Sequence, residues 1–115
     1  MRKDELLTRT KWFGLRIIRL VDALPDTSAG RAIGGQLVRC GTAVGANYRA
    51  ACRARSRAEF VAKIGIVEEE ADESAYWLEM IIEASLLEKR KVSDLLKEAE
   101  ELTRIMAASR ITAKG

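Results

Sequence analysis

Histidine is absent from this sequence of 115 residues, and its absence removes several kinds of catalytic site. A serine or cysteine nucleophile would lack the histidine base that usually activates it. The glycine patterns GxGxxG and GxxxxGKS/T, which hold phosphates in nucleotide-binding folds, are missing as well. We therefore expect a protein that is not an enzyme and that holds no cofactor.

Cysteine, proline and long apolar runs are also scarce. The two cysteines, Cys40 and Cys52, form no CxxC pair, which favours two reduced, partly buried thiols over a disulfide. Basic residues interrupt the apolar residues near the N-terminus, so no signal peptide is indicated. No stretch approaches the roughly 18 apolar residues of a membrane span. We expect a cytoplasmic protein with no membrane contact and no small-molecule substrate.

The charged residues, by contrast, are abundant and unevenly placed. A hydrophobic content of 48% with 32% charged residues is typical of one soluble globular domain. Residues 1–58 hold 12 basic and 4 acidic side chains, whereas residues 59–115 hold 8 and 13. The basic half therefore meets either a polyanion or the acidic half of the same or a neighbouring chain.

Apolar residues recur at alternating spacings of three and four in four segments, and no segment alternates with period two. The third segment is the longest and runs from Phe60 to Ser85. Short connections between helices imply antiparallel neighbours. We predict an all-α protein, an up-down-up-down antiparallel four-helix bundle. It forms one domain over residues 1–115, with helices at about 4–24, 29–53, 57–87 and 92–112.

Two of the turns carry recognisable signals. Pro25 disfavours helix at the residue before it, and Asp26, Thr27 or Ser28 can cap the helix that follows. Ser56 and Glu59 have the spacing of a capping box, in which each side chain accepts from the backbone N–H of the other. The chain is therefore expected to turn at about residues 53–57.

Two stripes of residues raise the question of self-association. Small residues line one side of the second helix, which indicates close packing either inside the bundle, the favoured reading, or against another subunit. On the third helix, Trp77 and its neighbours add to an already wide apolar face, and their residue types are enriched at interfaces. The candidate oligomer-interface residues are Gly41, Gly45, Asn47, Tyr48, Glu70, Glu73, Tyr76, Trp77 and Met80.

The acidic run EEEADE at residues 68–73 raises the question of a metal site. Carboxylate di-metal bundles use a Glu-x-x-His pair on two helices, and histidine is absent. Acids three residues apart on one face repel each other, so a cationic partner is expected. We therefore favour a solvated or arginine-paired acidic face over a metal site.

Arginines are the main charged residues of the stretch that precedes this acidic run. Arginine pairs equally well with phosphate and with carboxylate, and the only aromatic residue among them is Tyr48, so base stacking has little support. We expect the basic face of the second helix to meet RNA, DNA or a nucleoprotein partner through a salt-sensitive contact with the nucleic-acid backbone. The candidate residues for this contact are Arg39, Arg49, Arg53, Arg55, Arg57 and Lys63. The alternative is a structural assembly module that binds no nucleic acid, in which these arginines pair with third-helix acids across subunits.

The stretch from Ile33 to Ile82 resembles a family of bacterial four-helix-bundle proteins. Its members were first noticed as reading frames within intervening sequences of 23S ribosomal RNA genes. The matching features are Ala46-Asn47, the Arg-Ser-x-x-Glu-Phe corner at residues 55–60, and the glutamate-rich third helix that ends near Leu78-Glu79. Many members carry Asn-Ile-Ala-Glu-Gly in the second helix, where this chain has Asn47-Tyr-Arg-Ala-Ala.

The resemblance implies a bundle that assembles into a ring, a homopentamer in known relatives, with no established enzymatic activity. A related group comprises the accessory variability determinant proteins of diversity-generating retroelements. These form a basic pentameric barrel that works with a reverse transcriptase and nucleic acid. The resemblance thus implies a homo-oligomer and strengthens the expectation of nucleic-acid binding.

Overall fold

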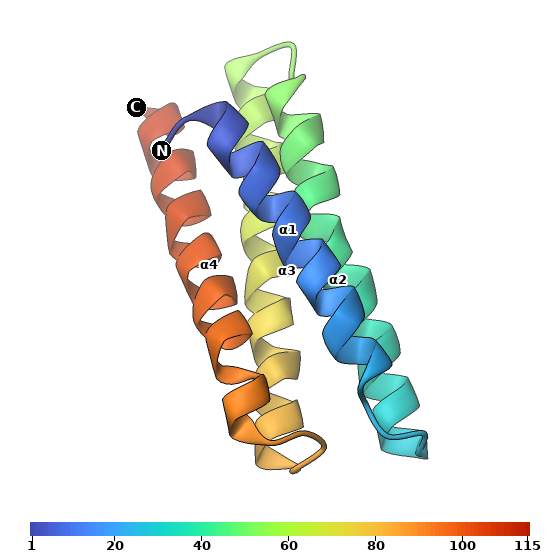
Figure 1. Cartoon of the computed structure of the whole chain (residues 1–115). Helices are drawn as coiled ribbons and strands as arrows, with labels where there is room; N and C mark the ends of the chain where they lie inside the picture. Colours follow the sequence, from blue (N-terminus) through green and yellow to red (C-terminus); the bar gives the residue numbers. More distant parts are fainter.

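Four helices run up and down along a molecule of 44 × 20 × 19 Å, and the predicted bundle architecture is confirmed (Figure 1). The computed structural model describes all residues from Met1 to Gly115. The elements are α1 (Lys3–Asp22), α2 (Ser28–Cys52), α3 (Arg57–Glu83), the short 3-10 helix η1 (Lys89–Lys91) and α4 (Ser93–Lys114). Both chain termini and the α2–α3 turn lie at one end of the bundle, as Figure 1 shows.

Each helix contributes one apolar stripe to a single core, as the three-four spacing predicts. Twenty hydrophobic residues are buried, and the largest fully buried ones include Phe13 of α1, Leu37 of α2, Leu78 of α3 and Met106 of α4. Each such side chain contributes roughly 1.5–3 kcal/mol to the free energy of folding. None of the four helices is both long and apolar enough to cross a membrane.

The helix starts follow the capping signals, with one difference. The Thr27 hydroxyl accepts from the Gly30 N–H and the Ser56 hydroxyl accepts from the Glu59 N–H, at 3.0 and 3.1 Å. The Glu59 carboxylate, however, accepts from the N–H of Arg55 at 3.4 Å, one residue before the predicted partner. The corner between α2 and α3 is therefore fixed by hydrogen bonds that involve both Ser56 and Glu59.

The end of α3 corrects the prediction. The helix ends at Glu83 rather than at residue 87, and Ser85 is exposed with φ 55°, so its predicted place in the core is wrong. The N–H groups of Leu86 and Ser85 bond to the carbonyls of Ile81 and Ile82, which is the hydrogen-bond pattern of a Schellman motif. Glycine usually takes the left-handed position in this motif, and here a serine does.

The glycines of α2 let α1 pack closely against it. A Cβ atom at Gly41 would lie 2.8 Å from two carbons of the Ile17 side chain, and one at Gly45 would lie 3.2 Å from the backbone of Thr10. Packing inside the bundle therefore accounts for both glycines. The contact between α1 and α4 is smaller than that of α1 with α2, and Arg9 of α1 bridges it through ion pairs to α4.

Candidate nucleic-acid interface

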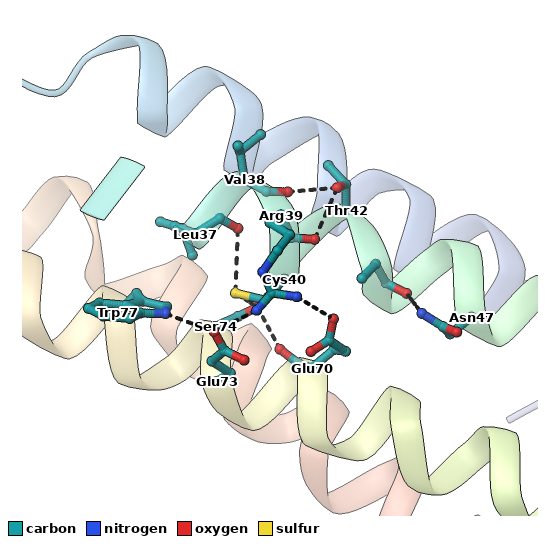
Figure 2. A network of polar contacts seen from close by, with 11 residues as sticks. Leu37, Val38, Arg39, Cys40, Thr42, Asn47, Glu70, Glu73, Ser74 and Trp77 are labelled. Carbon is teal, nitrogen blue, oxygen red and sulfur yellow. Dashed lines mark hydrogen bonds and ion pairs between the residues drawn. The ribbon is translucent and has the colours of Figure 1, made fainter. Parts of the chain in front are cut away.

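Arg39 is held by acids of its own chain. Its Nη1 lies 3.1 Å from Glu70 Oε2 and its Nη2 lies 2.7 Å from Glu73 Oε2, so one guanidinium joins α2 to both acids on α3 (Figure 2). The Trp77 indole N–H also donates to Glu73, at 3.1 Å. Together Arg39 and Trp77 hold the pKa of Glu73 below its usual value. The charge of Arg39 is thus matched within the subunit.

A small polar cluster lies beneath this ion pair. The Ser74 hydroxyl donates to the Glu70 carbonyl at 2.8 Å and lies 3.3 Å from the Cys40 sulfur (Figure 2). Burial raises the pKa of the Cys40 thiol, so the thiolate that would react is disfavoured. Cys40 is buried, Cys52 is half-buried, and both are free thiols.

The other paired acids are also held by arginines. Arg9 Nε lies 2.7 Å from Glu98 and its Nη2 lies 3.0 Å from Glu101, while Arg110 Nε lies 2.8 Å from Glu68. Hydrogen bonding to Glu98 raises the pKa of Arg9 above its already high ordinary value. No group of three or more Asp, Glu or Cys side chains converges on a point that could hold a metal ion. The structure therefore brings these acids together with arginines.

The remaining cations of the candidate strip have no acidic partner within 4.0 Å. They are Arg49 and Arg53 near the end of α2, Arg55 and Arg57 at the α2–α3 corner, and Lys63 in α3. All four arginines are exposed, and Lys63 is half-buried. The structure therefore splits the predicted strip into one paired arginine and five unpaired cations.

The unpaired cations gather at one end of the bundle. That end also carries the N-terminal Lys3 and the C-terminal Lys114, because both chain ends lie beside the α2–α3 turn (Figure 1). We call this set the basic end: Lys3, Arg49, Arg53, Arg55, Arg57, Lys63 and Lys114. The carboxylate of the nearby acid Glu59 accepts a hydrogen bond from the backbone N–H of Arg55 at the α2–α3 corner.

The candidate interface residues differ in how far they are buried within their own chain. Gly41 and Tyr48 lie inside the core of their own chain, where Tyr48 is only 5% exposed and its burial raises the pKa of the phenol. Tyr76 is exposed and makes an edge-on contact with half-buried Trp77, with 5.0 Å between the ring centroids. The other five candidates are half-buried: Gly45 and Asn47 in α2, and Glu70, Glu73 and Met80 in α3.

Sequence reasoning missed a groove between α1 and α2. It has a volume of about 630 Å³ and contains Leu7, Leu15 and Ile18 of α1, with Lys11 and Arg49 among the residues that line it. Leu15 and Ile18 are 41% and 40% exposed. The sequence does contain a signal for this groove, because Leu15 and Ile18 are apolar and yet lie outside the core stripe of α1.

Comparisons with known proteins agree with this architecture. The sequence model of a family described as "23S rRNA-intervening sequence protein" matches residues 2–108. The chain is also similar to a crystal structure of a protein of unknown function from the S23 ribosomal protein family of Bacteroides thetaiotaomicron. That similarity has 28% identity and a TM-score of 0.85, and it covers 91% of this chain and 97% of the other. Among curated proteins, none matches the chain.

Proposed function

The chain belongs to the 23S rRNA-intervening sequence protein family, and from this premise we propose that it is a non-enzymatic bundle that binds the phosphate backbone of RNA or DNA. The observation that carries the proposal is the unpaired charge of the basic end. Arg9, Arg39 and Arg110 each meet an acid of the same chain. Arg16 and Arg19, which line a smaller hollow with Arg90 and Lys91 near the other end, form no ion pair either. At the basic end, Arg55 and Arg57 meet no acid, so their charges are available to an outside anion.

The chemistry favours backbone contacts over base recognition. Arginine binds phosphate oxygens in the same forked geometry that it uses for carboxylates. Tyr48, the one aromatic ring among the arginines, is buried and offers no face for base stacking. We therefore expect binding that depends weakly on nucleotide sequence and strongly on salt.

Fluorescence anisotropy with a labelled RNA of random sequence at low salt tests this proposal. We expect Arg55→Glu with Arg57→Glu to weaken binding at least tenfold, because each change replaces a cation with an anion at the contact. The matched control is Lys89→Glu with Arg90→Glu, which makes the same charge change in η1 at the opposite end of the bundle. Equal losses in both variants would show a net-charge effect and would contradict a site at the basic end.

The proposal includes self-association, in which the chain forms a homo-oligomer. Apolar side chains remain exposed on α1, where Leu15 is 41% exposed, and on α3, where Ile66 and Tyr76 are 43% and 51% exposed. Such side chains favour burial against a partner. A pentamer, which the family resemblance implies, would have five times the chain mass of 12.8 kDa, about 64 kDa.

A further inference from the structure

The groove between α1 and α2 has an apolar interior and a basic rim. Leu7, Leu15 and Ile18 supply the apolar interior, and Lys11 and Arg49 lie among the lining residues with Gly45 between the helices. Trp12 is exposed on the same helix and lies outside this set, with the Arg19 guanidinium 5.9 Å from its ring centroid. An interior of this kind suits an apolar, acid-flanked surface better than it suits a phosphate chain.

The outward face of α3 has the opposite pattern. Tyr76 lies on it, Ile66 flanks it, and the exposed acids Glu69, Asp72 and Glu83 follow at helical spacing. None of these three acids has a cationic partner within 4.0 Å. The face therefore combines an exposed aromatic ring with unpaired negative charge, whereas the acids on its two sides are already paired.

We infer that the α1–α2 groove receives the outward face of α3 from a second copy of this chain. This inference rests on the proposed self-association and specifies the two surfaces that meet. Lys11 and Arg49 would face the acids of the second copy, such as Glu69 and Asp72, and the Tyr76 ring would enter the groove. Aromatic residues that fill a pocket are the usual anchors of protein interfaces.

The groove and the outward face of α3 have similar lengths along their helices. The groove extends along α1 from Lys3 to Ile18, which is about 22 Å of helix at 1.5 Å per residue. The acids of α3 extend from Glu69 to Glu83, about 21 Å by the same rise.

This contact divides the arginines between two roles. The contact joins two different surfaces, so each copy in a pair still has one free surface, either a groove or an α3 face. Further copies bind to these free surfaces, and the assembly closes into a ring or extends as a filament. Arg49 lies in the contact and pairs with carboxylates. Arg55 and Arg57 lie at the α2–α3 corner, outside the groove, and stay available to phosphate.

Charge reversal tests the contact by light scattering in the absence of nucleic acid. The groove variant carries Lys11→Glu and Arg49→Glu, and the face variant carries Glu69→Lys and Asp72→Lys. All four positions are exposed, and none of their side chains forms an ion pair within the chain. We expect each variant to fall to the monomer mass of 12.8 kDa while circular dichroism stays helical. A chain with all four changes should assemble as the wild type does.

Each outcome decides between the claims. A monomeric wild type overturns the self-association and this inference together. A wild type that assembles, with variants that assemble equally well, overturns this inference alone. Monomeric variants that the four-change chain fails to rescue would show that these two surfaces do not meet each other. Lys89→Glu with Arg90→Glu is the control and should leave the mass unchanged.

Discussion

At the scale of single residues, the side of the helix on which an arginine lies determines which groups it contacts. Arg39 and Arg49 are ten positions apart, so at 100° per residue they point about 80° away from each other around α2. Arg39 reaches the acids of α3, and Arg49 lines the groove toward α1. Two residues of one type in one helix therefore meet different surroundings.

The ion pair between Arg39 and Glu73 should make the stability of the fold depend on pH in the acidic range. Its guanidinium holds the pKa of Glu73 below the ordinary 4.5, so the folded state binds that proton less readily than the unfolded state does. The contribution to stability is complete above about pH 4.5 and is lost as the pH falls through the lower folded-state pKa. In Arg39→Gln, the part of this contribution that Arg39 supplies is absent, and the part that the Trp77 N–H supplies remains.

Thermal unfolding at a series of pH values measures this effect. The melting temperature of Arg39→Gln should lie below that of the wild type at neutral pH, and the difference should shrink in acid. Arg31→Gln, which removes a mostly exposed pair with Asp26, is the control and should change little. A difference between Arg39→Gln and wild type that is constant from neutral to acidic pH would contradict the assignment.

At the scale of the element, the packing of α1 on α2 depends on particular glycines. Gly41→Ala would place its new methyl group 2.8 Å from the branched Ile17 side chain. We expect a loss of about 1–2 kcal/mol in the free energy of unfolding, because overpacking outweighs the gain in helix propensity. Gly35→Ala in the same helix meets nothing within 4 Å and should stabilise by up to about 1 kcal/mol. Chemical denaturation measures both, and similar effects of the two changes would contradict this packing.

The helices and their order were predictable because apolar spacing and capping residues are local signals. Thr27 and Ser56 mark two helix starts in the sequence, and both cap as expected. The end of α3 was not predictable, since neither glycine nor proline follows it and a serine takes the left-handed position. The partners of the arginines were unpredictable for a different reason. They depend on which neighbouring helix lies on each side, and spacing along one helix does not give that.

At the scale of the whole molecule, the charge imbalance of the sequence becomes a spatial one. The antiparallel course of the chain brings the α2–α3 corner and both termini to one end, so cations far apart in sequence gather there (Figure 1). Acids gather along α3, where Glu68, Glu70 and Glu73 meet arginines and Glu69 and Asp72 do not. We propose that Arg55 and Arg57 at the basic end bind nucleic acid, and that the groove lined by Arg49 binds the outward face of α3 from a second copy.

The salt dependence of RNA affinity tests the central claim most directly. Each phosphate contact on a single strand contributes about 0.7 to the slope of log affinity against log salt. Replacing Arg55 and Arg57 with glutamine should therefore make the slope shallower by about 1.4, because two contacts are lost. The same replacement of Lys89 and Arg90 should leave the slope unchanged. Equal slopes for the wild type and the Arg55→Gln, Arg57→Gln variant would contradict the claim that the basic end binds the backbone.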